Sequence, residues 1–116
     1  MDKINIRIIS FGYDSDCFQR IKEAFSKVLA SYASFGELVF SDIIPYWKHD
    51  GYGESYLSFR ANYSEEIDKI KSLLSSVWES DVTDSRWATI FCEDIYFMWM
   101  TGEDEEGWTL TCRGRV

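Results

Sequence analysis

The sequence predicts an α+β domain in which two helices pack on an antiparallel sheet. Two stretches carry apolar residues three and four positions apart, as in helices, and several others alternate apolar with polar residues, as in half-buried strands. Glycine and aspartate mark the turns between them. The chain has 116 residues, of which 46% are hydrophobic and 17% aromatic. This length and composition suit a single domain spanning residues 1–116 with a core of its own.

The first half of the chain contains a predicted strand, a helix and a β-prone stretch. Isoleucines alternate with polar residues over 4–8, which is the period of a half-buried strand. A side chain within 14–16 can cap the next helix, which we expect to end near Gly36 because glycine readily adopts the left-handed conformation. The stretch 37–44 is β-prone, and 47–53 has the composition of a turn. The apolar face of the helix comprises Phe18, Ile21, Phe25, Val28, Leu29 and Tyr32.

A second predicted strand and helix follow this turn. Apolar and polar residues alternate over 57–63, which predicts another half-buried strand. Either Asn62 or Ser64 can cap the helix that comes next. The predicted inner face of this helix comprises Ile67, Ile70, Leu73, Leu74, Val77 and Trp78.

The rest of the chain is predicted to be β-rich, with strands over 86–92, 95–100 and 108–113. The element order is therefore β-α-β-β-α-β with extra C-terminal strands. This order is typical of a ferredoxin-like, split βαβ core. We expect the centre of the core to be formed by Ile6, Phe25, Leu29, Phe59 and Leu74.

The negative charge of the chain is concentrated in one segment. The formal net charge is −8, and residues 79–106 hold nine acidic residues and one basic residue, a difference equal to that net charge. Two interpretations stay open: solvated acidic turns beside core aromatics, or a docking surface for a cationic partner with aromatic anchors. The aromatic residues considered in this segment are Trp87, Tyr96, Phe97 and Trp99.

The sequence shows no catalytic, metal-binding or cofactor-binding machinery. His49 and Asp50 lie in a turn with no nucleophile placed beside them, and Gly51-Tyr52-Gly53 lacks the third glycine and helix of a phosphate-binding loop. The acidic run 103–106 lacks the spacing of a calcium loop. We therefore expect no enzyme activity, no metal and no cofactor. Three cysteines without a CxxC pair indicate reduced, buried thiols: Cys17, Cys92 and Cys112.

The charge and the first residues suggest where the protein acts. The start of the chain lacks the unbroken apolar core of a signal peptide, and no apolar run reaches a membrane-spanning length, so we expect a cytoplasmic protein without a membrane partner. The net charge of −8 argues against direct binding to nucleic acid, which needs lysine and arginine. A protein with this charge is expected to have a basic partner or none.

These features resemble the small immunity proteins of bacterial toxin systems, such as contact-dependent growth inhibition and nuclease bacteriocins. The resemblance covers size, acidity, aromatic richness and the acidic turns 93–94 and 103–106. It implies a tight inhibitor whose carboxylates stand in for the phosphates that a nuclease toxin would hold. The partner would be a cognate protein toxin with a basic surface. The residues expected to contact it are Glu93, Asp94, Trp99, Glu103, Asp104, Glu105, Glu106 and Trp108.

Two other functions stay open. A ferredoxin-like domain can bind a small molecule, or regulate by dimerisation, through the exposed face of its sheet. Such a domain should have a pocket among apolar sheet residues, whereas an inhibitor should present acidic and aromatic residues on a flat or convex surface. A small enzyme would need several polar residues to converge in one cleft, drawn from His49, Asp50, Arg60 and Arg86.

Overall fold

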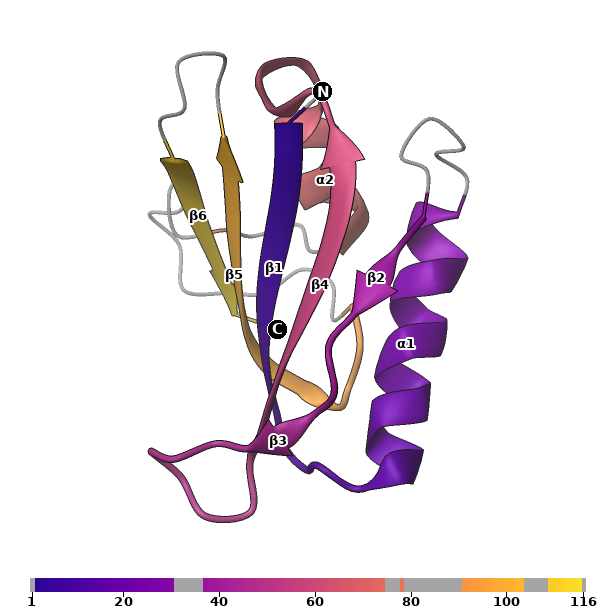
Figure 1. Ribbon diagram of the computed structural model, residues 1–116, viewed down its shortest axis with the longest axis vertical. Helices are drawn as coiled ribbons and strands as arrows, with labels where there is room; N and C mark the ends of the chain where they lie inside the picture. Colours follow the sequence, from indigo (N-terminus) through magenta and orange to yellow (C-terminus); the bar gives the residue numbers. More distant parts are fainter. Residues whose placement is uncertain (1, 31–36, 75–77, 79–90, 104–108, 116) are drawn as a thin grey trace.

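The computed structural model has an α+β fold in which one antiparallel sheet carries two helices (Figure 1). It describes the chain over residues 2–30, 37–74, 78, 91–103 and 109–115, without the side chains of residues 103, 109–112 and 115. In chain order the elements are β1 (Asp2–Ser10), α1 (Ser15–Leu29), β2 (Val39–Phe40), β3 (Ile44–Pro45), β4 (Gly53–Ala61), α2 (Tyr63–Leu74), β5 (Ile95–Glu103) and β6 (Thr109–Arg115).

The sheet is built around β1. In the described part of the chain the sheet has six strands. Five of them pair in the order β2-β4-β1-β5-β6, and the sixth, β3, also pairs with β4. Every pairing is antiparallel. Ile6 lies opposite Leu57 of β4 and Met100 of β5, so the first strand joins segments that are far apart in the sequence.

Both helices pack on one face of this sheet. Figure 1 shows α2 behind β1 and β4, and α1 and α2 contact each other. The side chain of Asp14 caps α1 by accepting a hydrogen bond from the Cys17 N–H, 2.7 Å away. All five residues expected at the centre of the core are buried, which confirms that part of the prediction: Ile6, Phe25, Leu29, Phe59 and Leu74.

Two glycines on the helix-covered face make room for aromatic rings. A Cβ atom added at Gly102 would lie 2.6 Å from Cγ of the Tyr63 ring, and one added at Gly114 would lie 2.8 Å from Cδ2 of the Trp78 ring. Tyr63 and Trp78 are both buried. The rings therefore occupy space that any other residue would fill at these positions of β5 and β6.

Several predicted boundaries are wrong. The first helix ends at Leu29 rather than near Gly36, and residues 31–36, with Tyr32, lie outside the described part. The β-prone stretch 37–44 forms the short strands β2 and β3, which pair with β4 in registers that differ by one residue. Between them the Tyr56 N–H donates to the Ser41 hydroxyl, 2.8 Å away, instead of to a backbone carbonyl. The fourth strand begins at Gly53, before the alternation becomes regular, because it follows β1 to its end.

The second helix also ends earlier than predicted. It stops at Leu74, and Trp78 forms an isolated antiparallel bridge with Gly114 instead of lying on the helix. The Trp78 ring N–H donates to the carbonyl of Lys71 over 3.0 Å, so the side chain still packs against the last turn. In the predicted strand 86–92, only Phe91 and Cys92 are described, and neither lies in a strand.

Candidate functional site

The β3–β4 loop, residues 46–52, holds several aromatic side chains at one end of the sheet. The Tyr46 N–H donates to the carbonyl of Tyr52 (2.8 Å), and the Tyr52 N–H donates to the carbonyl of His49 (3.2 Å). Gly51 has a φ of 82°, the left-handed conformation that glycine adopts without strain. These bonds close the loop tightly, so its large side chains project outward from a fixed backbone.

The loop packs on the segment that follows β1. At Gly53 an added Cβ would lie 2.8 Å from the Ser10 hydroxyl and would also collide with the Gly12 carbonyl, so the two backbones touch. The Phe11 N–H donates to the carbonyl of Asp94, 2.9 Å away, which ties the end of β1 to the start of β5. Three separate parts of the chain are thereby held at the same end of the sheet.

The aromatic side chains of these parts form one continuous chain of ring contacts. Phe11 lies 5.5 Å from Tyr52 and 5.6 Å from Tyr96, measured between ring centroids, and Tyr52 lies 5.2 Å from the His49 ring. Tyr46 continues the chain to His49 and to Trp47. Such edge-to-face and tilted geometries are favourable for aromatic pairs. We call this set the aromatic surface: Phe11, Tyr46, Trp47, His49, Tyr52 and Tyr96.

The aromatic surface is exposed where a folded domain would ordinarily bury such residues. Trp47 is 78% exposed and Phe11 is 50% exposed, and the other members are half-buried or exposed. Contiguous exposed apolar patches on a domain mark interaction sites more often than single exposed residues do. Tryptophan and tyrosine are also the residues that most often supply binding energy in protein interfaces.

Cations close to the aromatic surface are already engaged. Arg7 forms an ion pair with Glu54, with Nε donating over 2.8 Å, and its guanidinium lies 5.8 Å from the Tyr46 ring centroid. Burial lowers the pKa of Arg7. The hydrogen bond and the charge of Glu54 together raise this pKa by more than burial lowers it, so the net shift is upward. Lys48 lies over the Trp47 ring, 5.1 Å from its centroid.

Three exposed carboxylates lie on the segments next to those that carry the aromatic surface. Asp50 follows His49 in the loop, Glu93 precedes the start of β5, and Asp16 lies in the first turn of α1. All three side chains are exposed, and among the residues that the structure describes none of them forms an ion pair. This end of the sheet therefore combines aromatic rings with unneutralised negative charge.

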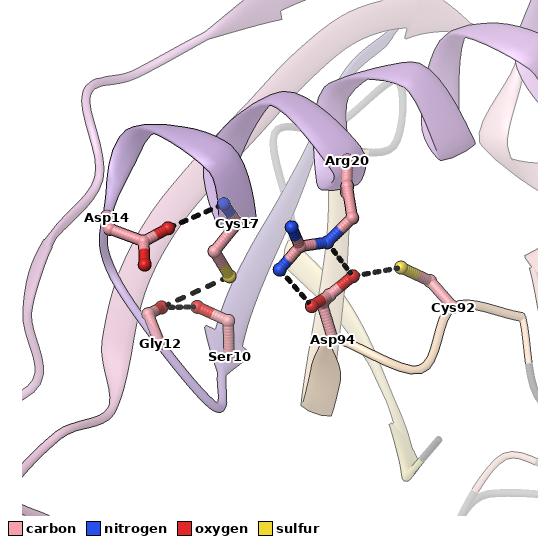
Figure 2. Close-up of polar contacts among 7 residues, drawn as sticks. All are labelled: Ser10, Gly12, Asp14, Cys17, Arg20, Cys92 and Asp94. Carbon is pink, nitrogen blue, oxygen red and sulfur yellow. Dashed lines mark hydrogen bonds and ion pairs between the residues drawn. The ribbon is translucent and has the colours of Figure 1, made fainter.

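Asp94 has a different environment from its neighbour Glu93. Figure 2 shows its carboxylate facing the guanidinium of Arg20, which donates through Nε (3.0 Å) and Nη2 (2.9 Å), and the thiol of Cys92 at 3.9 Å. The hydrogen bonds and charge of Asp94 raise the pKa of Arg20. This bidentate pair joins α1 to the start of β5, so Asp94 acts within the fold and Glu93 is free to face a partner.

Two thiols next to this ion pair are shielded. Burial raises the pKa of Cys17, and the nearby charge of Asp94 raises it further. Burial also raises the pKa of Cys92. The Cys17 Sγ lies 3.5 Å from the carbonyl oxygen of Gly12, which accepts its weak hydrogen bond (Figure 2). Neither thiol has the lowered pKa of a reactive nucleophile.

The structure separates the residues predicted to contact a partner. Glu93 is exposed beside the aromatic surface. Trp99 is half-buried on the sheet face that points away from the helices, and the Arg113 guanidinium lies 5.0 Å from its ring centroid. Glu103 ends β5, and its side chain lies outside the described part. The remaining predicted contact residues also lie outside it: Asp104, Glu105, Glu106 and Trp108.

Sequence reasoning did not identify the aromatic surface. It interpreted 47–53 as a turn in which His49 has no nucleophile beside it. A usable signal was present, because a turn that contains Trp47 and Tyr52 and follows Tyr46 has no strand or helix in which to bury these side chains. The contributions of Phe11 and Tyr96 depend on the pairing of distant strands, which no local pattern reveals.

Comparison of the chain with protein-family models, curated proteins and solved structures finds no match in any of the three. In the described part of the chain, no three His, Cys, Asp or Glu side chains converge in a way that could hold a metal ion. Neither described helix has the length and apolar character needed to cross a membrane.

Proposed function

We propose that this protein is an immunity protein that binds and neutralises a cognate bacterial toxin with a basic surface, such as a nuclease. The observation that carries the proposal is the aromatic surface, in which Trp47 is 78% exposed within a continuous chain of ring contacts. A rigid, exposed set of rings gives a partner large contact area at little cost in conformational entropy.

The surrounding charge suggests the partner's chemistry. Asp16, Asp50 and Glu93 are exposed near the rings, and the nearby cations Arg7 and Arg20 are paired with Glu54 and Asp94. Lys48 lies over the Trp47 ring and, in the described part of the chain, forms no ion pair, so three exposed carboxylates face one such cation. A partner with a basic surface would meet complementary charge here, which accelerates association. A nuclease has such a surface because it must hold phosphates.

The fold proposed for this function is a ferredoxin-like, split βαβ core with an added strand. The strand order β2-β4-β1-β5 supports it, with one helix after β1 and another after β4, and β6 extends the sheet beyond β5. In this arrangement one sheet face carries both helices. The end where β1, β4 and β5 meet the loop is then available to a partner.

The first test uses surface plasmon resonance to measure binding to a toxin-like domain, if an adjacent gene encodes one. Trp47→Ala should raise Kd about thirty-fold or more, equivalent to about 2 kcal/mol, mainly through faster dissociation. Tyr56→Ala is the matched control, because Tyr56 is 42% exposed but lies outside the chain of ring contacts. Equal effects of the two substitutions would remove the aromatic surface from the proposal.

Charge is tested separately from the rings. Replacing Glu103, Asp104, Glu105 and Glu106 with lysine should slow association and flatten its salt dependence, and Glu93→Lys should act in the same direction. Circular dichroism should show an unchanged fold. Absence of binding to the neighbouring toxin by the unaltered protein would instead favour a small-molecule-binding or regulatory domain.

A further inference from the structure

Two rings of the aromatic surface already contact cationic side chains of the chain itself. The Arg7 guanidinium lies 5.8 Å from the centroid of the Tyr46 ring, and the Lys48 ammonium lies 5.1 Å from the centroid of the Trp47 ring. A cation within about 6 Å of a ring centroid is attracted by the negative face of the aromatic system. These contacts indicate which chemical group the ring faces of this surface accept.

The two contacts differ in how firmly the cation is held. Arg7 is half-buried and forms an ion pair with Glu54, which is buried, so its place beside Tyr46 is part of the fold. Lys48 is exposed, and among the described residues it forms no ion pair. A cation–ring contact between exposed side chains changes an equilibrium only about two- to five-fold. Lys48 can therefore give up the Trp47 ring to a cation from another protein.

Trp47 offers more ring surface than Lys48 covers. The residue is 78% exposed even with the Lys48 ammonium over its ring. Its backbone is held by the bond from the Tyr46 N–H to the Tyr52 carbonyl, and its ring contacts the Tyr46 ring edge-on with centroids 6.3 Å apart. A fixed, open ring gives a partner side chain a flat contact at little cost in conformational entropy.

The charge of the loop favours a cationic group on this ring, and an arginine in particular. Asp50 follows Trp47 by three residues, is exposed, and in the described part of the chain forms no ion pair. A carboxylate can accept two parallel N–H bonds from a guanidinium group. The guanidinium group is also planar, weakly hydrated and able to stack on aromatic faces, whereas an ammonium group is a strongly hydrated point charge. A ring and a carboxylate on one loop therefore suit arginine better than lysine.

We infer that the Trp47 ring, with Asp50 as the carboxylate of its loop, is the receptor for an arginine side chain of the partner. The inference rests on the proposed function for the identity of that partner, a basic protein, and adds which side chain it presents to the ring. Lys48 then competes with the arginine, because it lies over the same ring and brings a like charge. An apolar side chain from the partner would use the ring but would gain nothing from Asp50.

The test uses two acetylated peptides of equal charge, one with three arginines and one with three lysines separated by glycine, titrated into isotope-labelled protein and followed by nuclear magnetic resonance. At low salt the arginine peptide should bind about two- to five-fold more tightly and should shift the Trp47 indole N–H signal. Trp47→Leu keeps an apolar side chain without the aromatic ring, so it should abolish the preference for arginine. Tyr56→Ala is the matched control, because Tyr56 is exposed outside the aromatic surface, and it should leave the preference unchanged.

A second substitution tests the competition by Lys48. Lys48→Ala should raise the affinity for the arginine peptide about two- to five-fold, because it vacates the ring and removes a like charge. Lys22→Ala is the matched control: it removes the same charge from α1, where Lys22 also lies over a ring, 4.4 Å from the Phe18 centroid. Its effect should be below about two-fold, since distant exposed charges are screened. Equal gains from the two substitutions would assign the effect to net charge and refute the competition.

The peptides separate this inference from the proposed function. Equal affinities for the two peptides, no binding of either peptide at low salt, or a preference for arginine that persists in Trp47→Leu would overturn the inference, even if the toxin-like domain binds. Failure of the toxin-like domain to bind would count against the proposed function, while the preference of Trp47 for arginine would stand.

Discussion

Substituting alanine for Gly102 tests how α2 is seated on the sheet. The Tyr63 ring, which begins α2, covers Gly102 of β5 so closely that an added Cβ would lie 2.6 Å from its Cγ atom. Tyr63 is 3% exposed, and its N–H donates to the side chain of Asp2 over 3.0 Å, so the residue is held from two sides. Ordinary contact requires at least 3.4 Å, so Cγ would have to move by 0.8 Å, and the ring atoms Cδ2 and Cε2, which lie nearer to the added Cβ, would have to move further.

The expected magnitude follows from two opposing effects. Overpacking a core by one methyl group costs about 1–3 kcal/mol, and the fixed position of Tyr63 places Gly102→Ala toward the upper end. Alanine is better than glycine within a strand by about 0.5–1 kcal/mol, which offsets part of this loss. We therefore expect Gly102→Ala to lower the free energy of unfolding by about 2 kcal/mol in a urea titration. The melting temperature should fall by about 8 °C.

The sign of the effect should reverse when the ring is removed. In a Tyr63→Ala background, Gly102→Ala no longer meets an obstacle and should stabilise by about 0.5–1 kcal/mol through its strand preference. Gly12→Ala is the control, because its added Cβ would be 3.7 Å from the nearest atom, the Cys17 sulfur. Equal losses from Gly102→Ala in both backgrounds would refute the proposed ring-on-glycine contact.

Two further predictions concern the core and its thiols. Phe25 is fully buried, with its ring 4.8 Å from Phe91 and 6.3 Å from Phe40, so Phe25→Ala should lower the free energy of unfolding by about 3–5 kcal/mol; a loss below about 1 kcal/mol in urea titration would contradict this packing. Because burial raises the pKa of both Cys17 and Cys92, iodoacetamide at pH 7.5 should alkylate them more slowly in the folded protein than in urea, measured for each site by peptide mass spectrometry. The same upward shifts mean that their contribution to stability is complete below the ordinary thiol pKa of about 8.5 and declines as pH rises through the higher folded-state pKa. Equal alkylation rates with and without urea would show that the thiols are accessible.

Local periodicity was sufficient to predict the central elements of the fold. The alternation of Ile4, Ile6 and Ile8 identified β1, and the spacing of Ile21, Phe25 and Leu29 identified the buried face of α1. In each case the residues that give the pattern are the residues that pack, so sequence and structure carry the same information. The broad α+β arrangement of two helices on an antiparallel sheet followed from these elements.

Features that depend on long-range pairing could not be predicted in this way. The spacing of Trp78 fits the apolar face of a helix, yet its bridge to Gly114 places it beside β6. Glu93 and Asp94 look equivalent in sequence, but in the described part of the chain Arg20 on α1 forms an ion pair with Asp94 and not with Glu93. The aromatic surface likewise exists only because β1 ends where β4 and β5 begin, which brings Phe11 close to Tyr52 and Tyr96.

The central position of β1 affects how the protein is made on the ribosome. Its two neighbours are β4 and β5, which are synthesised later. The strand therefore has both edges paired only after Leu57 and then Met100, the partners of Ile6, have been made. At a synthesis rate of about 5–20 residues per second, the interval between Ile6 and Leu57 is about 3–10 s, and Met100 follows only seconds later. Until β4 has been made, a strand with four isoleucines has both edges open, which is the condition that favours pairing between nascent chains. Slow translation should therefore reduce the soluble yield of this protein, and binding of a chaperone to residues 2–10 should restore it.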